Sequence, residues 1–312
     1  MLTPAPSRSD KLAVRRRAPY AASQFLFLAL LVTGRATGAT PHFPPTYVSI
    51  VIDDLGNSGP AGVKAVRLPG PVACAILPYT PYAAELAGMA RRRGKEVLLH
   101  LPMEPISGLD PGPGALDTAM SQNILELTLA GDLASVPYAS GVNNHMGSLL
   151  TSRAIPMDWL MDALHRRGGL FFLDSRTTAQ TVAAHTAGIY HVPHLSRDVF
   201  LDDVATTGAI EQQFALLIRI ARKRGYAVAI GHPRPATLKV LQALLPQLAF
   251  YRVRLVPLSM LLALRRPATA YWPLPLIRPP QAVRIPPTPL PKQDTPSSGW
   301  PGIETAPGHG NP

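Results

Sequence analysis

The chain has 312 residues, of which 46% are hydrophobic, and its formal net charge at pH 7 is +11. This length allows one large domain or two small ones, with enough apolar residues to bury a core. The single cysteine, Cys74, excludes an intramolecular disulfide, and its apolar neighbours indicate a core residue and not a catalytic thiol.

Residues 1–39 have the layout of a secretory signal peptide. A basic run, Arg15–Arg17, precedes the apolar stretch 25–32, and small residues follow at 36–39. The apolar stretch is too short for an ordinary membrane span, although an uncleaved N-terminal anchor is an alternative. In both cases we expect the rest of the chain to be exported to the periplasm or another extracytoplasmic space.

Much of the positive charge lies in this same segment. Six basic residues and one acid precede residue 40, so removing them lowers the net charge to +6. A mildly basic mature protein does not imply nucleic acid as a partner. An anionic envelope polymer or a membrane surface would suit the charge equally well.

Residues 46–265 alternate strand-like and helical patterns, and we expect them to form a single domain. Apolar, β-branched runs predict strands at 47–54, 72–77, 96–100, 140–148, 170–174, 188–193, 226–232 and 252–256. Helices are expected between them at 59–66, 82–93, 118–133, 157–167, 177–187, 210–224 and 235–245. Repeated β–α units of this kind predict a parallel sheet, either doubly wound or closed into a barrel.

From residue 267 to residue 312, proline dominates and apolar clusters are few. This composition predicts a disordered or polyproline-like tail. The tail could bind an envelope protein partner, although a tail without a binding role explains the composition better.

Asp53 and Asp54 stand at the end of the first predicted strand. The run from Val48 to Ile52 is almost continuously apolar, which is typical of a parallel strand buried on both faces. Two adjacent carboxylates in such a place repel each other unless a cation or a shared proton is present. The alternative is that Asp54 or Asn57 caps the next helix, but one acid would suffice for a cap.

Four other predicted strands also end in polar side chains. These side chains are His100 and Glu104, Asn143–His145, Asp174–Arg176, and His232, and each set lies at or just after the end of one strand. The carboxyl ends of parallel strands meet at one face, so we expect a single site there. Carboxylates and imidazoles together are ligands for zinc or a similar divalent ion, which would also relieve the repulsion between the two aspartates. Such an ion, with a histidine acid beside it, suits hydrolysis of an amide or ester.

Some of these residues also have ordinary structural explanations. His100 could be a buried histidine with satisfied hydrogen bonds, and Glu104 could cap the following loop. Asp202 and Asp203 lie close before a predicted helix, and we interpret them as caps outside the site.

Five motifs in this chain resemble the divergent polysaccharide deacetylases of bacterial envelopes. They are Ile-Asp-Asp-Leu-Gly, His-Leu-Pro-Met-Glu-Pro, Gly-Val-Asn-Asn-His-Met-Gly-Ser, Phe-Leu-Asp-Ser-Arg-Thr and Ile-Gly-His-Pro, within residues 46–262. The resemblance implies a distorted (β/α) barrel of about seven parallel strands. It also implies a metal-dependent hydrolase that removes acetyl groups from an acetylated polysaccharide or a peptidoglycan-like glycan.

The resemblance implies roles for the acids and histidines around the expected ion. Asp53 would be the base and Asp54 a metal ligand, as in the Asp-Asp motif of the family. His100 would be a second ligand. Glu104 stands where the family has another histidine, and His145 could replace a ligand. The expected ion is divalent, and zinc is the first candidate.

The remaining roles concern the acid and the substrate. His232 resembles the acid histidine of the family, and Asp174 resembles the acid that orients it. We assign Asn144 and Arg176 to substrate binding. The competing hypothesis is a non-catalytic envelope protein that uses the same cleft to bind glycan or to regulate a wall hydrolase. A serine esterase is disfavoured because the chain has no Gly-x-Ser-x-Gly motif.

Overall fold

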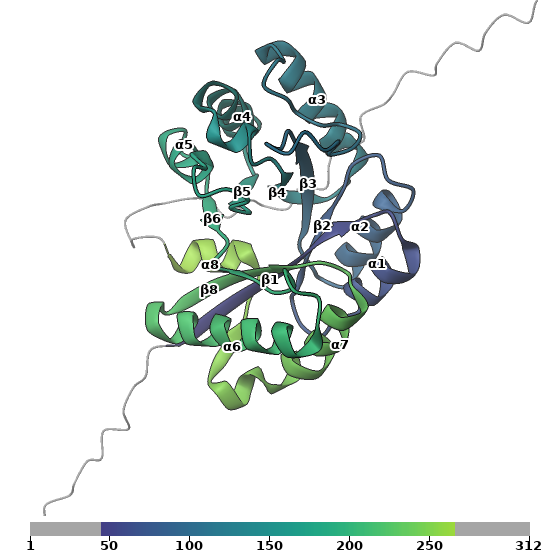
Figure 1. Cartoon of the computed structure of the whole chain (residues 1–312), viewed down its shortest axis with the longest axis vertical. Coiled ribbons are helices and arrows are strands. Elements are labelled where there is room, and N and C mark those ends of the chain that lie inside the picture. The colour runs from purple at the N-terminus through teal and green to yellow at the C-terminus, as the bar shows by residue number, and fades with distance from the viewer. Residues whose placement is uncertain (1–44, 266–312) are drawn as a thin grey trace, which may run out of the picture. The chain divides into compact units, whose positions relative to one another are not determined.

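The computed structural model describes residues 45–265, which form a parallel sheet with helices around it (Figure 1). The strands of this part of the chain are β1 (Thr46–Leu55), β2 (Ala73–Ile76), β3 (Val97–Met103), β4 (Ala139–Met146), β5 (Phe171–Asp174), β6 (His194–Ser196), β7 (Val199–Phe200), β8 (Tyr226–Gly231) and β9 (Val253–Leu255). The α-helices are α1 (Gly59–Val66), α2 (Ala83–Arg92), α3 (Gln122–Ser135), α4 (Ala154–Arg167), α5 (Ala183–Ile189), α6 (Thr207–Arg224), α7 (Pro235–Leu244) and α8 (Leu258–Leu264), and the 3-10 segments are η1 (Leu150–Ser152) and η2 (Leu245–Tyr251).

Two predicted segments, the signal segment 1–39 and the Pro-rich tail 267–312, lie outside the described residues. Among the helices of residues 45–265, none combines the length and the apolar character that a membrane span requires.

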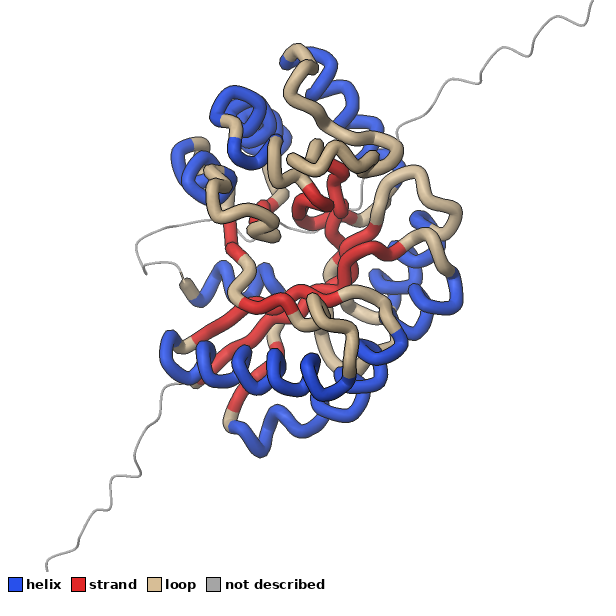
Figure 2. The backbone as a smooth tube through the Cα atoms, in the orientation of Figure 1, coloured by secondary structure: helices blue, strands red, loops and turns tan. Residues whose placement is uncertain are grey.

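The sheet curls into an open barrel. Its strand order is β6-β5-β4-β3-β2-β1-β8-β7, with β9 beside the start of β1, and the paired strands run parallel. β6 and β7 are the two edges of this order, yet only residues 197 and 198 separate them in the chain, so the edges lie close together. Within residues 45–265 no ladder joins the edges, and Figure 2 shows the strands curving round an interior with helices outside. The predicted distorted β/α barrel is confirmed.

Strand alternation separates two groups of apolar side chains. One group lies between the sheet and the helices and includes Ile50 and Ile52 of β1. The other lies inside the barrel and includes Val51, Leu98 and Ile230, together with residues of α8. The first residues of α8 donate hydrogen bonds to Glu96, just before β3, so α8 lies at the amino ends of the strands. Successive side chains of a strand point to opposite faces, so each strand contributes to both groups. At the carboxyl ends of the strands, the side chains that point into the barrel therefore converge.

The segment between β5 and β7 differs from the prediction. The sequence predicts a helix at 177–187 and a strand at 188–193, but α5 and β6 each begin six residues later than that. The Thr181 hydroxyl donates to the Asp174 carboxylate and accepts from the Ala183 N–H. Because this hydroxyl competes with helical hydrogen bonds, the residues before it stay in a loop and the later elements shift along the chain.

α3 buries a carboxylate that has the Tyr79 side chain as a polar neighbour. Asp132 is fully buried, and neither of its oxygens makes a well-formed hydrogen bond within residues 45–265, although Tyr79 lies close enough to oppose in part the effect of burial on its pKa. The preceding loop packs so closely that a Cβ added to Gly114 would collide with one of these oxygens. Burial raises the pKa of the Asp132 carboxyl to about 7. The folded protein therefore keeps a proton on Asp132 at a pH at which the unfolded chain has released it.

We expect Asp132→Asn to remove this pH dependence of stability. The folded-state pKa lies above the unfolded value, so wild-type stability falls as the pH rises between the two values, and a neutral amide has no such loss. The free energy of unfolding of the variant relative to wild type should grow by about 2–3 kcal/mol from pH 5 to pH 8. Urea unfolding of both proteins at both pH values measures this change. If the variant and wild type differ in free energy of unfolding by the same amount at pH 5 and pH 8, the raised pKa of Asp132 is contradicted.

Candidate metal centre and active site

The end of β1 presents two neighbouring carboxylates to the same site. Asp53 is 3% exposed and continues the inward alternation of Val51. Asp54 would point the other way in a regular strand, but its φ of +56° is a left-handed conformation that turns its side chain towards the site. Such conformations cost about 1–3 kcal/mol in residues other than glycine and cluster at functional sites.

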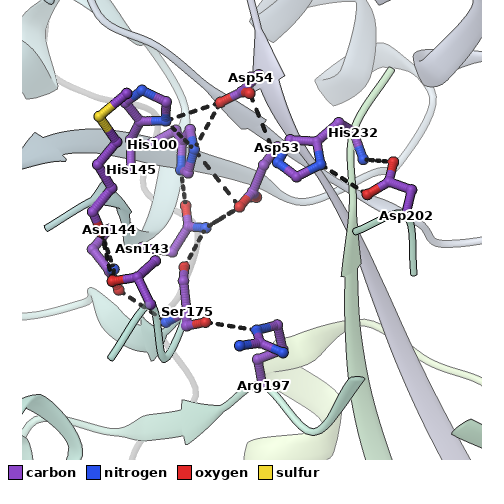
Figure 3. A network of polar contacts seen from close by, with 12 residues as sticks. Asp53, Asp54, His100, Asn143, Asn144, His145, Ser175, Arg197, Asp202 and His232 are labelled. Carbon is purple, nitrogen blue, oxygen red and sulfur yellow. Dashed lines mark hydrogen bonds and ion pairs between the residues drawn. The ribbon is translucent and has the colours of Figure 1, made fainter. Parts of the chain in front are cut away.

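Asp54, His100 and His145 bring three ligand atoms together (Figure 3). Asp54 Oδ1 lies 3.0 Å from His145 Nδ1 and 3.2 Å from His100 Nε2, and the two ring nitrogens are 3.1 Å apart. Asp54 Oδ1 is buried between these two ring nitrogens. A buried oxygen and two imidazole nitrogens that all face one another form a natural cation site. Because carboxylate oxygen and imidazole nitrogen are ordinary zinc ligands, these residues fit zinc or a similar divalent ion.

The charges of this cluster favour a cation. Burial raises the pKa of Asp54, but His100 and His145 lower it more, so its pKa lies well below the usual range. Burial lowers the pKa of His100, but Asp53 and Asp54 raise it more, and its pKa lies above the usual range. Two carboxylates thus impose a negative potential on the imidazoles, and a bound cation would neutralise it.

Asp53 lies beside the three ligand atoms without being one of them. Its two oxygens accept hydrogen bonds from Asn143 Nδ2 at 3.0 and 3.1 Å, and Oδ2 lies 3.6 Å from His100 Nε2. Burial raises the pKa of Asp53, and the neighbouring imidazoles of His100 and His232 oppose this only in part. A carboxylate with a raised pKa in such a place is suited to accept a proton.

His232, directly after β8, faces Asp54 and is held by Asp202. His232 Nδ1 lies 2.9 Å from Asp202 Oδ1, and Nε2 lies 3.7 Å from Asp54 Oδ2. Asp202 is fully buried, and its other oxygen accepts from the His232 main-chain N–H and the Thr237 hydroxyl. Burial lowers the pKa of His232, but Asp202 and the Asp53 and Asp54 carboxylates raise it more. The imidazole therefore directs Nε2 towards the site in a state suited to donate a proton.

A sequence model of the divergent polysaccharide deacetylase family matches residues 50–262, more than half of the chain. The chain belongs to this family. It is 42% identical over 195 residues to the protein YibQ of Escherichia coli (strain K12), covering 62% of this chain and 61% of YibQ. The chain thus spans less than two thirds of the length of that relative.

Two further proteins are similar to this member of the divergent polysaccharide deacetylase family. A Haemophilus influenzae protein is 39% identical over 201 residues, which cover 64% of this chain and 71% of the relative. The crystal structure of an Agrobacterium tumefaciens C58 protein superposes with a TM-score of 0.67 at 28% identity, covering 70% of this chain and 89% of the other. The family resemblance and the fold expected from it are therefore confirmed.

Within this deacetylase-family fold, Asp174 does not orient His232, and that prediction is wrong. Asp174 Oδ1 accepts from the Arg176 N–H at 2.9 Å, within its own loop. Strand alternation explains the difference, because Leu173 belongs to the group inside the barrel and the next side chain points outward. Asp202, which the sequence suggested as a helix cap, holds His232 instead.

Glu104 does not join the metal ligands, contrary to the prediction. Its Oε2 accepts hydrogen bonds from the N–H and the hydroxyl of Thr118, both at 2.7 Å. The three converging ligand atoms belong to other residues. The structure therefore supports the alternative that Glu104 organises the loop after β3.

Asn144 and Arg176 use their polar groups within the protein. Asn144 Oδ1 accepts from the Ser175 N–H, and Nδ2 donates to the Met146 carbonyl, both at 2.8 Å. Both ends of the Asn144 amide are thus occupied, which argues against the predicted role in substrate binding. Arg176 is exposed, and its carbonyl accepts from Arg197, so its role in substrate binding stays a prediction.

Asn143 and Asp202 have roles in the site that the sequence does not predict: from the sequence, Asn143 stands at a strand end without a role, and Asp202 is interpreted as a helix cap. The sequence signal for both is that each lies two residues from another residue of the site, and residues two apart in an extended segment point to the same face. Asn143 and His145 lie on the same face of β4, and the residue between them points away. Phe200 and Asp202 likewise share a face, since the Phe200 ring stacks on His232 with centroids 5.3 Å apart. Counting this alternation along the printed sequence would have found Asn143.

Proposed function

We propose that the protein is an exported, metal-dependent hydrolase that removes acetyl groups from an envelope polysaccharide. The observation that carries the proposal is the convergence of Asp54, His100 and His145, whose ligand atoms include the buried Asp54 Oδ1 within 3.2 Å of both ring nitrogens. A buried carboxylate and a carboxylate-held imidazole flank the cluster, and hydrolysis needs such a base and acid. Membership of the divergent polysaccharide deacetylase family supports an acetylated glycan as the substrate class.

Each group has a role that its position suits. A divalent ion held by Asp54, His100 and His145, with zinc as the first candidate, would polarise the acetyl carbonyl and activate water. Asp53 would accept the proton of the attacking water, because burial raises its pKa beside the ligand set. His232 would donate a proton from Nε2 to the sugar nitrogen or oxygen that leaves the acetyl carbon.

The location and the partners are part of the same proposal. The layout of residues 1–39 supports export, and an acetylated polysaccharide or peptidoglycan-like glycan in the periplasm or another extracytoplasmic space would be the substrate. A role of the Pro-rich residues 267–312 in binding an envelope protein partner stays a prediction from their composition. Sequencing the N-terminus of protein recovered from the envelope would show whether the first segment is cleaved.

Metal analysis of the purified protein, together with acetate release from acetylated chitin oligomers and peptidoglycan, tests the proposal. We expect about one divalent ion per chain and acetate release that a chelator stops and zinc restores. Asp54→Ala should lose both, because it removes the oxygen that faces the two imidazoles. The matched control is Asp162→Ala, since Asp162 pairs with Arg166 on the outside of α4 and should behave as wild type.

Absence of both metal and acetate release, with Asp54→Ala behaving as wild type, would contradict the proposal. Glycan that binds without losing acetyl groups would favour the competing hypothesis. In that case the same residues would serve a non-catalytic envelope protein that binds glycan or regulates a wall hydrolase.

A further inference from the structure

Asn143 stands between the proposed base and the proposed metal ligands (Figure 3). It is fully buried on β4, two residues before His145. Its Nδ2 lies 3.0 and 3.1 Å from the two Asp53 oxygens and 3.3 Å from Ser175 Oγ, and its Oδ1 lies 3.0 Å from His100 Nδ1. Both polar atoms of this amide therefore contact residues of the site.

The chemistry of these partners fixes the orientation of the amide. An ionised carboxylate only accepts hydrogen bonds, so the NH2 group of Asn143 faces Asp53 and its carbonyl oxygen faces His100. Because that oxygen only accepts, His100 carries a proton on Nδ1. The other ring nitrogen, Nε2, is then able to offer a lone pair where Asp54 and His145 converge.

The sheet holds this amide in place. His100 and Asn143 are register partners on β3 and β4, and Asn143 is also the register partner of Leu173 on β5. The adjacent Asn144 accepts a hydrogen bond from the Ser175 N–H at 2.8 Å, which ties the end of β4 to the loop after β5. Asn143 is therefore anchored on both sides, and its side chain is pre-organised for its two partners.

We propose that Asn143 is a positioning residue that sets the His100 tautomer for metal binding and holds Asp53 beside the ion. The inference rests on the proposed function for the role of Asp53. One amide then links metal affinity to the placement of the base, so a change at residue 143 alters both. Partners of the second nitrogen of a metal-binding histidine typically change metal affinity by about 10- to 100-fold when they are removed.

The zinc affinity of the purified, metal-free protein tests the inference without requiring turnover. Competition with a chromogenic chelator would give the zinc Kd of wild type and variants. Asn143→Leu should weaken binding by about 10- to 100-fold, because it removes the acceptor for the His100 Nδ1 proton. Asn143→Asp keeps an acceptor there and should bind zinc at least as tightly as wild type.

Ser49→Ala is the matched control for damage to the barrel. It removes a buried hydrogen bond, from the Ser49 hydroxyl to the Val256 carbonyl at 2.8 Å, on the same strand as Asp53. Its zinc Kd should equal that of wild type.

NMR spectroscopy of the zinc-loaded protein tests the His100 tautomer directly. The His100 Nδ1 proton should resonate downfield in wild type, as a hydrogen-bonded proton does, and should move upfield in Asn143→Leu.

The inference is overturned if Asn143→Leu binds zinc as tightly as wild type. It is also overturned if both variants at residue 143 weaken binding equally, since that indicates general damage. Zinc binding could show this dependence on residue 143 while the wild-type protein releases no acetate. That result would contradict the proposed function and leave the metal-binding part of this inference standing.

Discussion

Replacing Asp202 with asparagine is expected to lower kcat for acetate release by about 100- to 10,000-fold while the protein keeps its metal. Asp202 Oδ1 lies 2.9 Å from His232 Nδ1, so the carboxylate accepts that N–H and stabilises the protonated ring. An amide can present an N–H to the same nitrogen, which favours the wrong tautomer and lowers the pKa of His232. Steady-state kinetics together with metal analysis measures the effect.

Asp174→Asn is the matched control for this prediction. It makes the same chemical change in another buried carboxylate, but Asp174 bonds to its own loop and not to His232. We expect kcat within a few-fold of wild type and a modest loss of stability. Equal losses of kcat in the two variants would show that Asp202 has no special relation to the acid.

Asp53→Asn should abolish most of the acetate release, by about 100- to 10,000-fold in kcat, without releasing the metal. The asparagine has the same shape, and its oxygen can still accept from Asn143, but an amide cannot take a proton from water. Asp54, His100 and His145 are unchanged, so the zinc content should remain that of wild type. Kinetics, metal analysis and a glycan-binding titration on the same preparation separate these effects.

The contrast between the two adjacent acids makes this prediction specific. Asp54→Ala should lose metal and turnover together, whereas Asp53→Asn should lose turnover alone. Retained turnover in Asp53→Asn would show that another group is the base. Loss of metal in Asp53→Asn would show that this carboxylate belongs to the ligand set.

Elements with strong local signals were predictable from the sequence. α1 has the predicted bounds, because the Ser58 hydroxyl caps it and Pro60 sits in its first turn. β1 follows from its apolar, β-branched run. The helix predicted at 177–187 failed because Thr181 bonds to Asp174 and to the backbone, and helical periodicity cannot reveal such a competing bond.

The site shows the same division between local and distant information. Asp53, Asp54, His100, His145 and His232 were predicted as site residues, and the structure brings them together. Each lies near the carboxyl end of a predicted strand, which is a local feature. The predictions that failed concerned partners, because a partner depends on which face a side chain occupies and on which strand lies next to it.

Periodicity and strand-end chemistry alone therefore account for the parallel β/α architecture, the position of the site and most of its acids and histidines. The folded arrangement was needed to show that Asp202 and not Asp174 meets His232, and that Asn143 joins Asp53 to His100. Asn143 and Asp53 are 90 residues apart in the chain. Contacts at that range depend on strand order, register and the closing of the barrel, and no local sequence pattern encodes these.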